Sequence, residues 1–535
     1  MDVVDVWTGH RANALRLALR MTNESYAQHL GTAVRTVAKW GSQPDLVPVS
    51  EIQRALDTAL SHASDAEQAR FALLVSRSPA AAVPGGNSAG TRAADPGAAD
   101  LRLAHDPAVN DALYWLGSRA GWSDAETRQR VRAELQALHP DLLESIAHRR
   151  SLISEAQRAD AIAAYYEIGA RAPYQFYSAR CDGTRYTTTV LTKLDWLDLN
   201  FPLGEGRDHL KLVTDEPSSP LSYFGKPAAD AAVRRLSEAL AVGTYMVNAP
   251  LYRLLNVTAS PEGLKGRVSL TSFVDYALTL DLLENELTDA LGCSDAITPG
   301  ALPLRDLYLP DMSSLIDLER RLCVGGPLAL TAIARSPGRH KNTSGDYVLL
   351  IQERSARVLN ASGRLAVIPK AFHQPLVDFS DDAQLSATLE REMEEELFGR
   401  PELDSTDQVH RSADPMHVTR LSEPMRWLME SADTEAWRTE CVGFGINAIS
   451  GNFECASLIV INDDRWWELY SGAIEANWET RGLLRYSSRN RDTITDLISN
   501  NAWSPEGLFA FLQALRRLEQ IGGERVSLPT IEVEA

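Results

Sequence analysis

Five glutamates and one arginine crowd the stretch LEREMEEELFG, residues 389–399. The apolar residues of this region recur at helical spacing, which predicts an amphipathic helix over residues 383–398 that packs on neighbouring strands. Glu390 and Glu394 point away from the apolar side, which is typical of a solvated helix face. The apolar stripe consists of Leu385, Leu389, Met393 and Leu397.

Three other glutamates, Glu392, Glu395 and Glu396, lie at or near the edge of the apolar side. A carboxylate at a core boundary is costly unless a cation pairs with it. Convergent carboxylates suit Mg²⁺, which prefers oxygen ligands and keeps waters for a phosphate substrate. Arg391 is the alternative partner, and it would lock the helix without any metal. The residues alone leave both interpretations open.

The segment REMEEELFG resembles the second half of the Nudix box, an Arg-Glu-apolar-x-Glu-Glu pattern. The resemblance implies a Nudix-like α+β domain in which Glu392, Glu395 and Glu396 hold Mg²⁺ and a nucleotide-type small molecule binds. It also implies that the preceding loop approaches a phosphate. The ligand-binding residues that we predict from it are Lys370, His373 and Arg391.

The first half of the Nudix box does not match this sequence. Ala383 stands where the family has a glutamate, and Val377 stands where it has a glycine. These missing residues shape the loop and help to position metal and nucleophile, so we name no catalytic residue. For Lys370 and His373 an ordinary solvent-exposed loop is the alternative.

A second motif occupies residues 14–43, ALRLALRMTNESYAQHLGTAVRTVAKWGSQ, and predicts three short helices. In the third, residues 33–40, the apolar side chains fall in one arc and Arg35, Thr36 and Lys39 fall in the opposite arc. Residues 11–41 hold five basic side chains and one acidic side chain, a local charge of +4, whereas the whole chain carries −19. A helix packed on one face and basic on the other is suited to the DNA major groove.

The segment SYAQHLGTAVRTVAKW resembles the helix-turn-helix of the XRE/lambda-repressor family, with a match over roughly residues 10–60. The resemblance implies binding of double-stranded operator DNA. Gly41 follows Trp40 where the family often has glutamate, so we expect the recognition helix to end early, at Trp40. A helical hairpin for protein contacts is the alternative. The predicted DNA-binding residues are Thr32, Arg35, Thr36 and Lys39.

Length and composition predict a multidomain protein. A chain of 535 residues is too long for one core, and the Ala-, Gly-, Pro- and Ser-rich stretch around 76–100 predicts a flexible linker. The fold class that we expect is an all-α N-terminal helix-turn-helix, a mostly helical middle region and an α+β Nudix-like C-terminal domain. The predicted boundaries are 1–75, 76–104 (linker), 105–325 (helical with some strands) and 326–535.

Together these features predict a bacterial, cytoplasmic transcription regulator that acts as a homodimer on two half-sites and senses a nucleotide-type ligand. The sequence contains no run of about eighteen apolar residues, so we expect no membrane span. The acidic start is unlike a secretory signal. Two alternatives stay open. One is an active Mg²⁺-dependent nucleoside-diphosphate hydrolase with an accessory helix-turn-helix, and the other is a non-catalytic protein-interaction scaffold.

Overall fold

In a computed structural model of the protein, the chain divides into two compact units, residues 1–89 and 90–535. The structure describes residues 7–534 except for 20, 22, 33–35, 38, 41–45, 49, 64–70, 72–95, 169–172, 205, 214–223, 245, 294–296, 298–299, 338–344, 356–357, 359–361, 400–415, 418–419, 432–435, 475–476 and 478. Each unit is described by itself.

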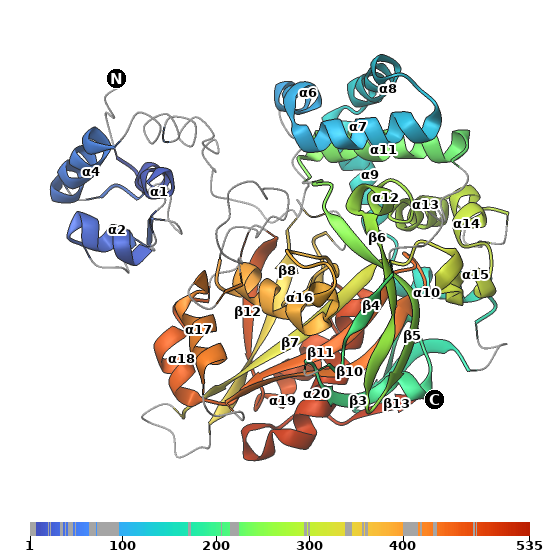
Figure 1. Cartoon of the computed structure of the whole chain (residues 1–535). Coiled ribbons are helices and arrows are strands. Elements are labelled where there is room, and N and C mark those ends of the chain that lie inside the picture. Colours follow the sequence, from blue (N-terminus) through green and yellow to red (C-terminus); the bar gives the residue numbers. More distant parts are fainter. Residues whose placement is uncertain are drawn as a thin grey trace. The chain divides into compact units, whose positions relative to one another are not determined.

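The smaller unit contains the helices α1 (Gly9–Ala18), α2 (Asn23–Leu30) and α4 (Ser50–His62) (Figure 1). Thr8 caps α1 by accepting a hydrogen bond from the N–H of Arg11. Aromatic residues fill the centre: Tyr26 meets Trp40 edge to face at 6.4 Å, and the indole N–H of Trp7 donates to Asp57 at 2.6 Å. The small core thus depends on a few large rings, as a short helical module requires.

A ten-stranded mixed sheet organises the larger unit, in the order β12-β8-β7-β11-β10-β2-β1-β13, with β3 on β10 and β9 on β8. β11 and β7 pair in parallel, and β10 and β11 pair antiparallel. The strands are β1 (Gln175–Cys181), β2 (Thr184–Thr192), β3 (Leu197–Pro202), β7 (Gly325–Arg335), β8 (Asp346–Arg354), β9 (Leu365–Val367), β10 (Trp437–Asn447), β11 (Phe453–Ile461), β12 (Thr480–Ser487) and β13 (Ile531–Glu534).

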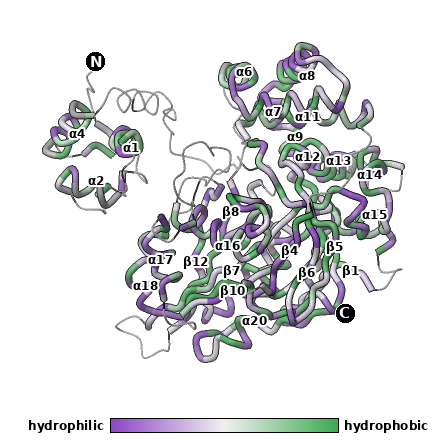
Figure 2. The backbone as a smooth tube through the Cα atoms, in the orientation of Figure 1, coloured by the Kyte–Doolittle hydropathy of each residue, from purple (hydrophilic) through white to green (hydrophobic). Residues whose placement is uncertain are grey.

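Both faces of this sheet are covered, so its central strands β7 and β11 are buried along nearly their whole length. Side chains alternate between the faces: Leu328 and Leu330 pack with one cluster, and Ala329 packs with the other. The long helix α20 (Pro505–Ile521) belongs to the first cluster, the one that contains Leu328 and Leu330. The helix α16 (Leu385–Glu392) belongs to the second cluster, the one that contains Ala329. Figure 2 shows hydrophobic residues along the strands and many hydrophilic ones on the outer helix α8 (Asp124–Ala137).

A smaller sheet of three strands, in the order β4-β6-β5, joins the second cluster. Its strands are β4 (Leu210–Leu212), β5 (Pro250–Ser260) and β6 (Gly263–Ser272). Helices form the remaining layers: α6 (Pro96–His105), α7 (Pro107–Ala120), α9 (Pro140–Ser151), α10 (Glu155–Tyr165), α11 (Lys226–Val242), α12 (Phe273–Ala277), α13 (Leu282–Leu291), α14 (Pro303–Tyr308), α15 (Met312–Ile316), α17 (Glu423–Glu430), α18 (Asp464–Tyr470) and α19 (Arg491–Ile498).

The expected fold class is wrong. We predicted an all-α N-terminal helix-turn-helix, a mostly helical middle region and a separate Nudix-like α+β C-terminal domain, whereas the chain is a mixed α/β protein with one large sheet. The sheet takes β1, β2 and β3 from the predicted middle region and β7 to β13 from the predicted C-terminal domain. Pairing between strands so distant in sequence leaves no signal in local periodicity.

Part of the predicted linker 76–104 lies outside the described residues, at 76–95, and its last nine positions belong to α6. In the described part of the chain, no helix combines the length and the apolar character that crossing a bilayer requires.

Candidate ligand-binding site

The predicted DNA-binding residues are only partly described. Arg35 lies outside the described residues, whereas Thr32 and Thr36 are half-buried and Lys39 is exposed. Val37 and Trp40 are buried in the core of the smaller unit, on the arc that was predicted to pack. The turn residue Gly31 has a φ of 65°, the left-handed conformation that favours glycine.

The acidic segment forms a helix whose predicted apolar stripe, Leu385, Leu389, Met393 and Leu397, is buried. Asp208 fixes its start, because Asp208 Oδ2 accepts a hydrogen bond from the N–H of Ser386 at 2.7 Å. Beyond Glu392 the chain widens into a π-helical segment, Met393–Leu397. Such segments are rare in proteins. Where they occur, they are often part of a functional site, because the wider turn redirects side chains.

Glu394 does not lie on a solvated face, so that expectation is wrong. It is fully buried, and its Oε1 accepts hydrogen bonds from the N–H and the hydroxyl of Ser422 at 2.8 and 3.1 Å. Ser422 is the N-cap of α17, so Glu394 joins the start of that helix to the acidic segment. Residues 391–397 are all buried, so other elements cover the acidic segment on every side.

Arg391 pairs with two of the three glutamates that were predicted to bind metal. Its Nη2 donates to Glu392 Oε1 at 2.8 Å, and its Nε lies 3.8 Å from Glu395 Oε1. Arg391 Nη1 also donates to the carbonyl of Gln374 at 3.2 Å. The Arg391 side chain is only 2% exposed. It is thus a buried cation for these glutamates, the partner that we named as the alternative to a metal ion.

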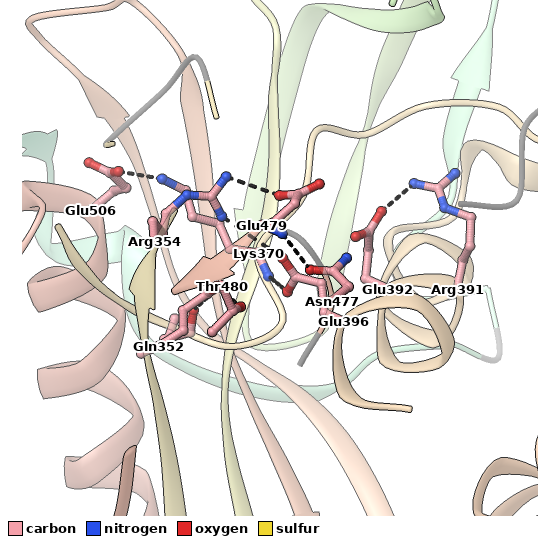
Figure 3. Close-up of polar contacts among 11 residues, drawn as sticks. Gln352, Arg354, Lys370, Arg391, Glu392, Glu396, Asn477, Glu479, Thr480 and Glu506 are labelled. Carbon is pink, nitrogen blue, oxygen red and sulfur yellow. Dashed lines mark hydrogen bonds and ion pairs between the residues drawn. The ribbon is translucent and has the colours of Figure 1, made fainter. Parts of the chain in front are cut away.

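Glu396 is fully buried behind Glu392. Its Oε2 accepts a hydrogen bond from the backbone N–H of Lys370 at 2.9 Å, and its Oε1 lies 3.9 Å from Arg354 Nη1. Burial, followed by the nearby carboxylates of Glu479 and Glu392, raises the pKa of Glu396 well above its usual value. Arg354 is held from its other side, because its Nη2 donates to Glu479 Oε2 at 3.1 Å (Figure 3).

Lys370 follows β9 and forms an ion pair with Glu506, the second residue of α20 (Figure 3). Glu506 Oε2 also accepts a hydrogen bond from the side-chain amide of Asn447 at 3.2 Å. Burial alone would raise the pKa of Glu506, but the Lys370 ammonium outweighs it and the pKa is lowered. The Glu506 carboxyl group therefore stays ionised although it is buried.

His373 does not line the cavity that opens beside the acidic segment. Its ring packs against Tyr252 with 4.4 Å between the centroids, and Nδ1 is 2.8 Å from Thr388 Oγ1. The side chain is fully buried. Burial, with the nearby Arg391 guanidinium, lowers the pKa of His373 to about 3, so the ring is neutral. This environment is that of a core residue.

A cavity of about 150 Å³ opens beside the acidic segment and brings Lys370, Glu392 and Glu395 together in its wall. Arg391, His373 and Glu396 are not among its lining residues. One part of the wall is charged and also contains Arg354, Glu454 and Glu479. The other part is mainly apolar and includes Val247, Ala249, Leu251, Phe273, Val358, Ala371 and Phe372.

Sequence reasoning missed five polar residues of this cavity, Gln374 among them. Arg354 ends β8 and Glu479 precedes β12, and neither belongs to a recognisable motif. Asn452 and Glu454 lie at the start of β11, where every residue of the strand is buried. A glutamate inside such an apolar strand was a usable signal, because a buried charge requires a partner or a function.

Carboxyl groups outnumber cations around the cavity. The surrounding charged cluster contains six carboxyl groups and three cations. Burial is the main cause that raises the pKa of Glu392 to about 8 and the pKa of Glu454 well above its usual value, as for Glu396. The cluster consists of Glu392, Glu395, Glu396, Glu454, Glu479, Glu506, Arg354, Lys370 and Arg391.

The predicted Mg²⁺ ligands do not converge as a set of three. Glu392 and Glu395 face the cavity, whereas Glu396 is engaged by Lys370 and Arg354. Among the residues that the structure describes, no group of three or more histidine, cysteine, aspartate or glutamate side chains is placed to hold a metal ion. Mg²⁺ binding stays a prediction, for which two cavity-facing carboxylates are available.

Comparison with known proteins adds no relative. No model of a protein family matches this chain, and a search of curated proteins finds no match. The resemblances to the helix-turn-helix and to the Nudix box therefore depend on their short motifs alone.

Proposed function

We propose that this chain is a DNA-binding transcription regulator whose larger unit binds a small ligand in the cavity beside the acidic segment. The observation that carries the ligand-binding part is the cavity itself. It combines an aromatic and aliphatic wall with charged side chains, as small-molecule sites do. Lys370, Glu392 and Glu395, three residues that the sequence singled out, lie in its wall.

The ligand that we propose is of the nucleotide type and enters with Mg²⁺. Phe273 and Phe372 offer rings against which a heterocycle can pack. The cations of the cluster are already paired with carboxylates, so none of them is available to a bare phosphate. A divalent cation next to Glu392 and Glu395 would supply the missing positive charge, and this is why the proposal includes the metal.

The DNA-binding part is supported by the smaller unit. Val37 and Trp40 are buried while Lys39 of the same helical turn is exposed, which is the division that a reading helix needs. One small module gives limited affinity, so the proposed regulator acts as a homodimer that binds two half-sites at once. A ligand that favours one arrangement of the dimer would then change operator affinity.

Two measurements test this function. A mobility shift of the full chain on the DNA upstream of its own gene should be lost in Arg35→Ala/Lys39→Ala and should weaken steeply with salt. Lys265→Ala, which removes an equally exposed lysine from the larger unit, should leave the shift unchanged. Retention of the shift in the double variant would exclude the predicted reading helix.

The ligand is tested by thermal shift of the full chain with adenosine 5′-diphosphate and ADP-ribose, each with and without Mg²⁺. Stabilisation that requires Mg²⁺ and is lost in Glu395→Gln is the expected result. Turnover of either compound would favour the hydrolase instead. No stabilisation under any of these conditions would contradict the proposed nucleotide site.

A further inference from the structure

Two polar side chains at the start of β11 face the cavity together. Asn452 is 4% exposed and Glu454 is 6% exposed, and both line the cavity. Glu454 is the second residue of β11, and Asn452 directly precedes this strand. No sequence motif drew attention to either residue.

Both side chains retain acceptor capacity that the described part of the protein does not use. The Asn452 amide donates to Tyr276 Oη at 3.2 Å, but its buried Oδ1 has no hydrogen-bond partner among the described residues. Within the same residues, the Glu454 carboxyl group forms no hydrogen bond or ion pair. A buried acceptor without a partner costs about 1–3 kcal/mol, so the retention of Asn452 Oδ1 beside a cavity points to a ligand.

Among the residues that the structure describes, no cation forms an ion pair with Glu454. The Lys370 ammonium partly offsets the rise in the pKa of Glu454, but it already forms its ion pair with Glu506. Across the parallel pair, the neighbour of Glu454 on β7 is Gly326, which has no side chain to offer. Glu454 is therefore a carboxyl group of the cluster with which no described cation pairs.

An aromatic wall stands in the same cavity. Phe372 packs against Phe273 at 5.8 Å and against Tyr276 at 5.1 Å, ring centre to ring centre. Tyr276 is also the residue to which Asn452 donates, so the acceptors and the rings are neighbours. A planar or cationic group held by the acceptors would also contact an aromatic face or edge.

We propose that Asn452 and Glu454 form an acceptor pair that binds a nitrogen donor group of the ligand. The group is either the amino group of a heterocycle or a protonated amine, because both present several N–H donors and neither repels a carboxylate. Asn452 Oδ1 receives one N–H and the Glu454 carboxyl group receives another. This assignment rests on the proposed ligand-binding function and names the chemistry that the site selects.

Two matched pairs of probes test the acceptor pair by isothermal titration of the full chain. The first pair is adenosine 5′-diphosphate and purine riboside 5′-diphosphate, which lacks the amino group, both with Mg²⁺. The second is benzylamine and benzyl alcohol. In the wild type we expect the amino member of one pair to bind at least about tenfold more tightly, as expected for loss of a hydrogen bond to a charged group. The pair that shows the preference identifies the source of the nitrogen.

Two variants should abolish that preference independently. Glu454→Gln and Asn452→Leu each remove part of the acceptor pair, and either should reduce the tenfold preference to less than about threefold. Glu440→Gln is the matched control, because Glu440 is equally buried on β10 but pairs with Arg517 and does not line the cavity. Near-UV circular dichroism identifies any variant that does not fold, and the other variant then decides.

The outcomes separate this inference from the proposed function. Equal binding of both members of each pair to the wild type, or a preference that survives in the folded variants, overturns the acceptor pair and leaves the cavity as a ligand site. Failure of all four probes to bind the wild type overturns the nucleotide site and the acceptor pair together.

Discussion

The backbone N–H of Lys370 donates a hydrogen bond to Glu396 Oε2 at 2.9 Å and so ties the segment after β9 to the π-helical segment. Glu396 is fully buried, and two other carboxyl groups, Glu392 and Glu479, contribute to its raised pKa. A buried carboxyl group near others favours its protonated form, which still offers an acceptor oxygen to the N–H of Lys370. The contact is therefore structural.

Glu396→Gln should be tolerated, because the amide oxygen can accept the same hydrogen bond without adding charge. Glu396→Leu should lower the free energy of unfolding by about 1–3 kcal/mol, because the Lys370 N–H loses its partner in a buried place. Urea unfolding of the full chain measures both. Equal losses in the two variants would show that the hydrogen bond does not matter.

Arg354→Met should be more damaging than removal of an exposed ion pair. The Arg354 side chain is 7% exposed and lies between Glu396 and Glu479, so its loss leaves two carboxyl groups without their cation. Breaking a buried pair of this kind costs about 3–5 kcal/mol. Arg481→Met is the control, since Arg481 is 61% exposed beside Glu353, and it should cost less than about 1 kcal/mol.

Helical periodicity predicted the parts of the site that depend on local structure. The stripe from Leu385 to Leu397 is buried, and Glu392 and Glu395 line the cavity. Lys370 lines the same cavity, but it was predicted from the resemblance to the Nudix box. The periodicity failed at Glu394, because a helical wheel does not show which other elements cover a helix, and residues 391–397 are all buried.

The remainder of the site depends on strand order, which local patterns do not contain. Arg354 and Glu479 meet because β8 and β12 are neighbours, although their sequences are more than a hundred residues apart. Asn452 and Glu454 reach the cavity because β11 pairs with β7 in parallel. The same non-local pairing placed β1 to β3 in the large sheet and made the expected fold class wrong.

Glu394→Ala should destabilise the larger unit by about 1–3 kcal/mol, because Ser422 at the start of α17 loses the partner of its N–H and its hydroxyl. Glu430→Ala, at the exposed end of the same helix, should change stability by less than about 0.5 kcal/mol. Thermal unfolding followed by circular dichroism compares them. Matching midpoints would restore the interpretation of Glu394 as a solubility residue.

His373 should make stability depend on pH. Its pKa is about 3 in the folded protein and near 6.5 in the unfolded chain, so between these values the unfolded state binds the additional proton. The stabilisation is fully present above about pH 6.5 and is lost as pH falls, by up to about 1.4 kcal/mol per pH unit.

His373→Asn keeps a hydrogen-bonding group near Thr388 but does not titrate in this range. Its unfolding midpoint should therefore fall less steeply than that of the wild type between pH 6 and pH 4. His139→Asn removes an exposed histidine from the N-terminal end of α9 and should leave the wild-type slope unchanged. Parallel slopes for wild type and His373→Asn would show that the ring is not kept neutral by burial.

Gly326→Ala should deform the cavity wall. A Cβ at this position would lie 2.2 Å from the carbonyl oxygen of Ala371 and 2.7 Å from the backbone nitrogen of His373. That segment has little freedom to move, because the N–H of His373 donates to Gly325 at 2.7 Å and the His373 carbonyl accepts from the N–H of Tyr252 at 2.9 Å. Overpacking against fixed backbone costs about 1–3 kcal/mol, and the displaced segment carries the cavity residues Ala371 and Phe372.

We therefore expect Gly326→Ala to lower the unfolding midpoint and to abolish probe binding. Gly472→Ala, where an added Cβ meets nothing within 4 Å, should change neither. Probe binding that persists unchanged in Gly326→Ala would show that the ligand does not occupy this cavity.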